Sequence, residues 1–204
     1  MTPTASEALY IPAQTCPPRK KWTRAECAAL EGTGVWNQQH LELIWGDLIN
    51  KMGKKKPHSI VITVINTWLR GAFGERYVYQ EVPIDVAPDD NPTNEPEPDL
   101  IVLAKPLSAI KSDNATPADL RLLVEISDST LSFDQTTKAE LYARAGIIEY
   151  WIFDIPGRRL LVHRDPRDGQ YRSVKAYSEE ESASPLAAPD REFRVAEAFE
   201  GIDK

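Results

Sequence analysis

Three ionisable residues occupy positions that suit chemistry better than an ordinary surface. Asp99 opens the apolar run PDLIVLA directly after Pro98, and Glu125 lies late in a second apolar run, LRLLVEIS. Lys138 follows thirteen residues after Glu125, in a segment with helical character. A carboxylate at the end of a buried strand is unfavourable unless it is paired, hydrogen-bonded or bound to a metal. The three residues therefore form a candidate site.

A divalent cation would offset the repulsion between these two carboxylates. Two carboxylates on neighbouring strands repel each other unless a cation or a shared proton intervenes. Mg²⁺ prefers oxygen ligands and uses one or two carboxylates, leaving its other positions to water and phosphate oxygens. The backbone carbonyl of Ile126 could be a further ligand, since its side chain points away from that of Glu125. With Lys138 supplying positive charge toward a phosphate, the pattern indicates a phosphodiesterase that uses Mg²⁺ or Mn²⁺.

The elements around these residues predict one sheet. Both apolar runs are typical of strands with two buried faces. Ser132 and Gln135 form a capping-box pattern that predicts a helix start, and Gly146 predicts its end. Downstream, IIEYWIFDI, RRLLVHR and QYRSVKAYS predict three successive antiparallel strands. We expect an α/β or mixed α+β domain, with a central mixed β-sheet flanked by helices.

The first half of the chain predicts further elements. Thr23 and Glu26 form a capping box for a helix over 24–31. The segment HLELIWGDLINKM predicts a hairpin that turns at Gly46-Asp47. Apolar residues at helical spacing predict a helix from about Ser59 to Gly74, and YVYQEVPIDV predicts a strand.

Length and composition limit the number of domains and the partners that the chain can bind through its charge. The 204 residues suit one domain, which we place at 22–204 after a flexible arm at 1–21 that carries four prolines. Thirty-one acidic residues against 24 Lys and Arg give a net charge of -7. This excess disfavours binding to nucleic acid through bulk charge, although a local basic patch or a bound cation could overrule it.

Cysteine usage and hydropathy bear on location. Cys16 and Cys27 belong to no CxxC or Cys/His cluster, which favours a reducing compartment. The sequence shows neither a secretory signal nor a run of roughly 20 apolar residues. We expect a soluble cytoplasmic protein that does not enter a membrane.

A family resemblance follows from the motifs themselves. The runs EPDLIVL, LLVEIS and DQTTKAELYARAGIIEYWIFD resemble the Uma family of putative restriction endonucleases, a branch of the PD-(D/E)XK nuclease superfamily. Upstream, LELIWGDLI and Pro57-His58-Ser59 are similar to the N-terminal half of that family, so the resemblance spans roughly residues 40 to 160. It implies a restriction-endonuclease-like core that cleaves DNA with Mg²⁺.

The resemblance also implies roles for single residues. Asp99 and Glu125 match the acidic metal ligands of the family. The usual superfamily lysine stands two residues after the glutamate, where this chain has Ser127. In the Uma branch a helix lysine takes its place, and Lys138 matches it, provided that its tip reaches back to the strand end. Glu42 and His58 match family positions near the site.

Other interpretations remain open for these residues. Asp99 could serve only to form a turn before its strand. Lys138 could be a surface lysine, and His58 could be a residue that starts a helix. The missing lysine and the net acidity also suit a catalytically silent nuclease-like scaffold that binds a protein or nucleic-acid partner. A phosphohydrolase of small phosphate esters would differ only in substrate. Exposed aromatic side chains around Tyr150 and Trp151 would suit a homodimer.

Overall fold

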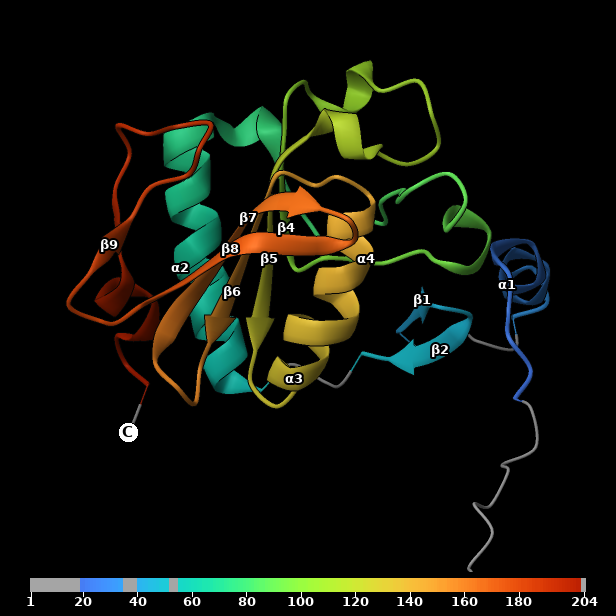
Figure 1. The fold of residues 1–204 in the computed structure, drawn as a ribbon, viewed down its shortest axis with the longest axis horizontal. Coiled ribbons are helices and arrows are strands. Elements are labelled where there is room, and N and C mark those ends of the chain that lie inside the picture. Colours follow the sequence, from blue (N-terminus) through green and yellow to red (C-terminus); the bar gives the residue numbers. More distant parts are fainter. Residues whose placement is uncertain (1–18, 35–39, 52–54, 203–204) are drawn as a thin grey trace, which may run out of the picture.

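The centre of the molecule is a six-stranded mixed sheet. The computed structural model describes residues 19–34, 40–51 and 55–202, and Figure 1 shows the sheet between helices. The strand order is β3-β4-β5-β6-β7-β8, and β5 and β6 pair in parallel while all other neighbours pair antiparallel. The expected mixed α+β class is confirmed. The strands are β3 (Val78–Gln80), β4 (Leu100–Leu103), β5 (Leu120–Ser127), β6 (Glu149–Asp154), β7 (Arg159–Arg167) and β8 (Gln170–Tyr177).

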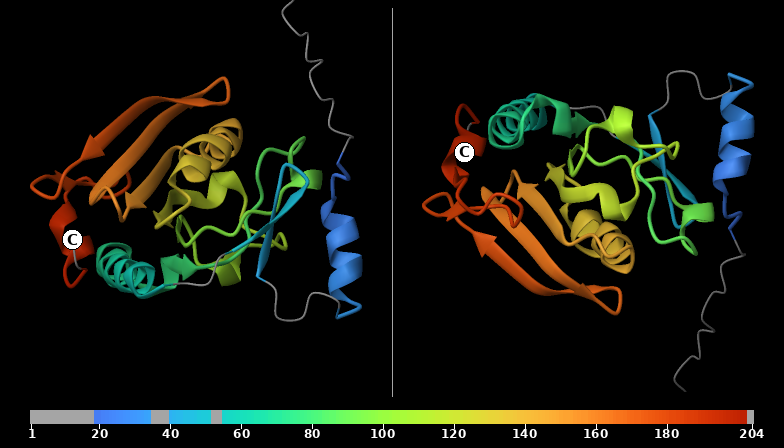
Figure 2. Two further views of the ribbon diagram at one scale, coloured as in Figure 1. Left: turned by 90° about the horizontal axis from the view of Figure 1, so that it is seen from below. Right: turned by 90° about the horizontal axis from the view of Figure 1, so that it is seen from above.

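Helices cover both faces of this sheet. Helix α2 (Lys56–Phe73) packs on one face, and α3 (Leu131–Phe133), a π-helical turn (Asp134–Lys138) and α4 (Ala139–Arg144) run continuously along the other (Figure 2). Side chains alternate along β5, so Val124 joins the cluster under α2 while Leu123 joins the cluster under α4. The same alternation turns Glu125 toward α4.

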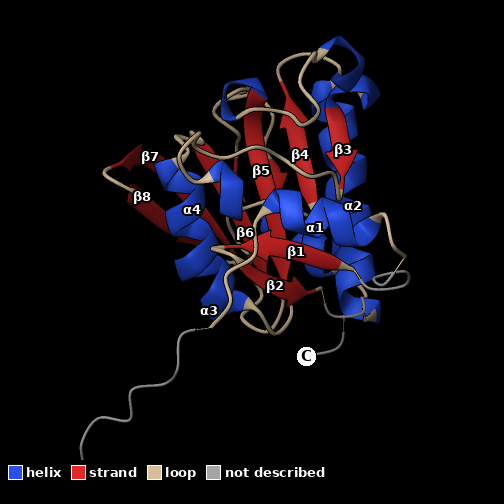
Figure 3. Ribbon diagram, turned by 90° about the vertical axis from the view of Figure 1, so that its right-hand side faces the viewer, coloured by secondary structure: helices blue, strands red, loops and turns tan. Residues whose placement is uncertain are grey.

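The remaining elements flank the sheet. Helix α1 (Arg24–Glu31) and the hairpin of β1 (Leu41–Ile44) and β2 (Asp47–Asn50) lie together at one side (Figure 3). The C-terminal part adds the short pair β9 (Ser182–Ala183) and β10 (Phe193–Arg194). Short 3₁₀ helices span Glu75–Tyr77, Asn91–Thr93, Leu107–Ala109, Pro117–Asp119 and Val195–Phe199.

Most local predictions in the first half hold. The capping box of Thr23 and Glu26 is present at the start of α1. The hairpin turns one residue earlier than predicted, because Trp45 and Gly46 adopt positive φ angles of 50° and 73° and Asp47 already begins β2. Helix α2 begins at Lys56, before the predicted Ser59, and ends at Gly74 as predicted.

Two predicted boundaries are wrong. The strand expected over 77–86 is only three residues long, because Glu81 turns the chain with a φ of 50°. The capping box of Ser132 and Gln135 does not form, since the helix begins at Leu131. The hydroxyl of Thr130 donates instead to Asp134, at 2.7 Å.

The structure bears on two further expectations, the homodimer and the flexible N-terminal arm. Tyr150 and Trp151 are fully buried, so they provide no dimer surface, and the homodimer stays a prediction without that support. Most of the predicted arm, residues 1–18, lies outside the described part of the chain. Lys20 and Lys21, the last residues of the predicted arm, form ion pairs with Glu26 and Asp47.

Among the helices that the structure describes, none has the length and apolar character to span a membrane.

A buried histidine in β7 makes stability depend on pH. His163 is only 4% exposed, packs between the rings of Tyr150 and Tyr171, and its Nδ1 has no hydrogen-bond partner in the described structure. Burial lowers the pKa of His163 from 6.5 to about 4. As the pH falls, the unfolded chain therefore takes up this proton before the folded chain does. The contribution of neutral His163 to the free energy of unfolding is present above pH 6.5 and is lost as the pH falls toward 4.

We expect the free energy of unfolding to contain a His163-dependent loss of about 2 kcal/mol between pH 7.5 and pH 5. Urea unfolding of the native chain and of His163→Phe at both pH values isolates this part, because Phe keeps the ring contacts and cannot titrate. An equal pH slope in the two proteins would contradict the assignment.

Candidate active site

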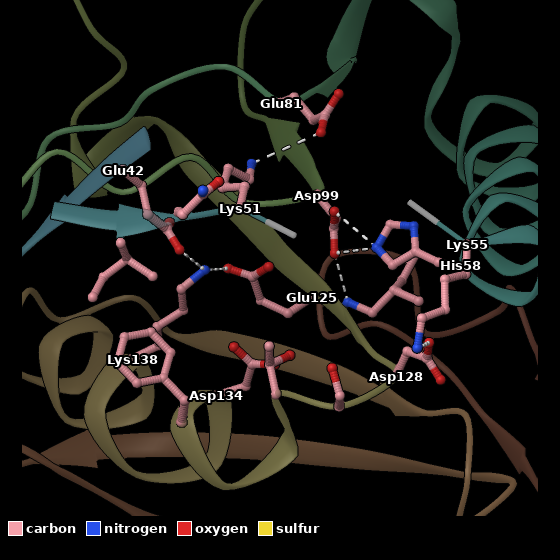
Figure 4. A pocket seen from close by; sticks show the side chains of 16 residues that line it. Glu42, Lys51, Lys55, His58, Glu81, Asp99, Glu125, Asp128, Asp134 and Lys138 are labelled. Atoms are coloured by element: carbon pink, nitrogen blue, oxygen red, sulfur yellow. Dashed lines mark hydrogen bonds and ion pairs between the residues drawn. The ribbon is translucent and has the colours of Figure 1, made fainter. Parts of the chain in front are cut away.

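The predicted site residues surround one cavity at the start of β4 and the end of β5. The cavity has a volume of about 130 Å³ and is bordered by the β1–β2 hairpin, the start of α2 and the π-helical turn (Figure 4). Its acidic groups outnumber its basic groups, which suits a site for a cation. The ionisable residues that line it are Glu42, Glu81, Asp99, Glu125, Asp128 and Asp134, with Lys51, Lys55, His58 and Lys138.

Asp99 lies immediately before β4 and is held as a carboxylate. Its Oδ2 accepts a hydrogen bond of 2.8 Å from the backbone N–H of Ile126, and His58 Nε2 lies 3.3 Å from both carboxylate oxygens. Burial by itself would raise the pKa of Asp99. The contact and charge of His58 and the Ile126 N–H outweigh it, so the pKa lies below its usual value. Asp99 is therefore charged at neutral pH.

Glu125, Lys138 and Glu42 form a buried group on the other side of the cavity. Lys138 Nζ lies 2.9 Å from Glu125 Oε1 and 3.0 Å from Glu42 Oε1, and all three residues are about 4% exposed. Burial opposes the charge of Lys138, but the two carboxylates outweigh it and raise the pKa of Lys138. Lys138 therefore stays protonated.

One ammonium does not balance the acids gathered here. Burial raises the pKa of Glu125 to about 8 although Lys138 opposes the shift, and the charges of Asp99, Asp134 and Glu42 add to it. A carboxyl group with this pKa is mostly protonated at neutral pH unless a further cation approaches. The excess of acid is the feature of this cavity that a divalent cation would relieve.

The oxygen atoms near Asp99 fit Mg²⁺. Both hydrogen bonds to Glu125 end on Oε1, so Oε2 receives none from the described residues. The N–H of Ile126 points to Asp99, and its carbonyl points to the same side of the strand. The described side chains contain no group of three or more His, Cys, Asp and Glu residues that could hold a metal. Two carboxylates, one carbonyl and water remain, a ligand set that Mg²⁺ accepts.

The π-helical turn brings Lys138 to the strand end. A turn with i→i+5 bonds is wider than an α-helical turn and occurs often at functional sites. Here it buries both Asp134 and Lys138. Ser127, at the position of the superfamily lysine, donates to Asp134 Oδ2 at 2.5 Å. The ammonium group therefore arrives from the helix, and its tip reaches Glu125 as the sequence argument required.

Comparison with known families decides where the chain belongs. The model of the family Uma2, described as "Putative restriction endonuclease", matches residues 26–196. The chain belongs to the Uma2 family. A crystal structure of a putative nuclease belonging to DUF820 from Anabaena variabilis ATCC 29413 is similar to it with a TM-score of 0.62 and 15% sequence identity, over 79% of this chain and 90% of that one. At this identity the likeness shows the fold alone. A search of curated proteins found no match.

Within the Uma2 fold, several residues that the sequence argument did not single out line or support the cavity. Asp134 begins the π-helical turn and is buried. Lys51 donates to the carbonyl of Glu97 at 2.7 Å, and Lys55 Nζ lies 3.5 Å from Asp128. Tyr142 is a buried core residue, and its hydroxyl also donates to Glu125. The available signal was its spacing, because it follows Lys138 by four residues and so lies on the same helix face.

Proposed function

We propose that this Uma2 protein is a Mg²⁺- or Mn²⁺-dependent endonuclease that hydrolyses phosphodiester bonds of DNA. The family supports a nuclease, and the single observation that carries the finer proposal is the geometry of one cavity. Asp99 and Glu125 face it from adjoining strands, and the ammonium group of Lys138 touches the second of these acids.

Asp99, Glu125 and the carbonyl of Ile126 would hold the cation. When bound, the cation polarises the phosphate oxygens and lowers the pKa of water beside them. His58 contacts both oxygens of Asp99 from the first turn of α2, which orients that ligand and favours its charged form. Groups behind a metal ligand commonly set its orientation and basicity in this way.

Lys138 acts through its charge. Because its pKa is raised, it does not take a proton from water at neutral pH. Its ammonium group instead stabilises the negative charge that develops on the phosphate as the water oxygen bonds to phosphorus and the leaving oxygen departs. Glu42 restrains the same ammonium from the β1–β2 hairpin, at 3.0 Å.

The charges at the entrance of the cavity affect how a DNA phosphate could approach. A net charge of -7 disfavours contact with phosphates over the whole surface. Lys55, with an exposed side chain at the start of α2, and the neighbouring Lys51 place positive charge at the cavity. Together with a bound cation they would offset the acidic lining where a phosphate enters.

Plasmid nicking with Mg²⁺ or Mn²⁺ tests the proposal. We expect the native chain to nick supercoiled DNA, and Asp99→Ala and Lys138→Ala of confirmed fold to be much slower. Equal activity in all three proteins would remove these residues from the mechanism.

A catalytically silent scaffold is the second candidate. It is favoured by Ser127 at the superfamily lysine position, the net acidity and the lack, among the described residues, of a group of three metal-binding side chains. Isothermal titration with Mn²⁺ separates the two candidates. Binding that is lost in Glu125→Ala favours the enzyme, whereas a folded chain that binds no divalent metal favours the scaffold.

A further inference from the structure

Tyr142 is a buried residue that contacts the site from behind. Its side chain is fully buried on α4, and its hydroxyl donates a hydrogen bond of 3.0 Å to Glu125 Oε1. Lys138 Nζ donates to the same oxygen at 2.9 Å. Tyr142 is not among the residues that line the cavity, so it would not touch a substrate there.

The hydroxyl group has a specific partner. A buried hydroxyl is unfavourable unless it is hydrogen-bonded, and phenylalanine would make the same edge-to-face contact with Tyr150, whose ring centroid lies 5.1 Å away. Among the described residues, Glu125 is the partner that the hydroxyl of Tyr142 has. Burial raises the pKa of Tyr142 well above its usual value, so the hydroxyl keeps its proton and acts as a donor.

Two donors on one oxygen restrict how the carboxylate can turn. The terminal torsion of a glutamate is broad, so an isolated carboxylate samples many orientations. With Lys138 and Tyr142 both bound to Oε1, the other oxygen, Oε2, is directed away from the helix. Figure 4 shows the carboxylate of Glu125 between Lys138 and the side of the cavity where Asp99 lies.

We infer that Tyr142 is a positioning residue, which together with Lys138 orients Glu125 so that Oε2 is available to a divalent cation shared with Asp99. This inference rests on the proposed function. It means that α4, one turn beyond Lys138, helps to orient a ligand of the cation site.

Direct Mn²⁺ titration of the full chain tests this role without relying on activity. We expect Tyr142→Phe to raise the dissociation constant for Mn²⁺ by about tenfold, the lower end of the range for residues that orient metal ligands. Tyr171→Phe is the matched control, because it also removes a tyrosine hydroxyl from the α4 side of the sheet. That hydroxyl donates to the carbonyl of Ile147, so the affinity should stay unchanged.

A double-mutant cycle separates positioning from a general effect on structure. If Tyr142 acts through Glu125, Tyr142→Phe should have no further effect on Mn²⁺ affinity in the Glu125→Gln background. Should Tyr142→Phe fail to fold, 3-fluorotyrosine at position 142 provides a second probe. Its ¹⁹F resonance should shift as Mg²⁺ is added and saturate with the dissociation constant of the metal.

The outcomes distinguish this inference from the function on which it rests. If the native chain binds no Mn²⁺, the proposed function fails. If the native chain binds Mn²⁺ and Glu125→Gln binds it more weakly, while Tyr142→Phe binds as the native chain does, the inference is overturned and the proposed function stands. A ¹⁹F resonance that Mg²⁺ does not move would also overturn it.

Discussion

Asp99→Asn is expected to slow Mg²⁺-dependent DNA cleavage by about a thousandfold while the chain stays folded. A bound cation supplies several kcal/mol of transition-state stabilisation, and about 1.4 kcal/mol corresponds to a tenfold change in rate. Asparagine keeps an oxygen that can accept the N–H of Ile126, so the strand end retains that hydrogen bond. What it loses is the charge that would hold the cation.

The matched control for this variant is Asp119→Asn. Asp119 is also a largely buried aspartate, but it lies at the opposite end of β5 and pairs with Lys105. Its substitution should leave the cleavage rate within about twofold of the native rate, because a site so far from the cavity has no direct interaction with the cation. Cleavage by Asp99→Asn at the rate of Asp119→Asn, with circular dichroism showing both folded, would disprove the role of Asp99.

Lys138→Met is expected to separate folding, metal affinity and catalysis. Removing one partner of a buried ion pair leaves an uncompensated charge and lowers the free energy of unfolding by about 3 to 5 kcal/mol. Here two carboxylates, on Glu42 and Glu125, lose their shared ammonium. Mn²⁺ should therefore raise the melting temperature of the variant more than that of the native chain. Cleavage should fall by at least about a hundredfold, because the charge near the phosphate is gone.

Two further variants control this experiment. Lys105→Met removes a half-exposed lysine that pairs with Asp119, so we expect a loss of about 1 kcal/mol or less and normal cleavage. Lys138→Arg keeps the positive charge and should retain most of the stability that Lys138→Met loses. Unaltered cleavage in folded Lys138→Met would show that the ammonium group has no part in the reaction.

The sequence by itself determined the elements whose signals are local. Apolar runs predicted β4 and β5, and the alternation within LRLLVEIS already separated Glu125 from the neighbours that face α2. Gly74 and Gly146 ended their helices because both adopt positive φ angles that other residues rarely tolerate. The motif order also indicated Asp99, Glu125 and Lys138 together, since a shared cation is a chemical reason for acids at adjoining strand ends.

Only the tertiary structure decided how these groups meet. Glu42 reaches Lys138 because the β1–β2 hairpin is held by the pairing of Leu43 with Glu95, a contact between segments far apart in sequence. The predicted capping box is absent because the helix already begins at Leu131. In the π-helical turn that follows, Ser127 from the preceding strand donates to the carboxylate of Asp134, a contact between strand and helix that no local pattern records. The spacing of Tyr142 from Lys138 placed it on the same helix face, but only the packing of α4 against β5 showed that its hydroxyl meets Glu125.

The physical reason for this division is the range of the forces involved. Strand alternation and helix ends depend on a residue and its near neighbours, so a linear pattern records them. The polarity and pKa of a buried group depend on everything packed around it, and those neighbours come from distant parts of the chain.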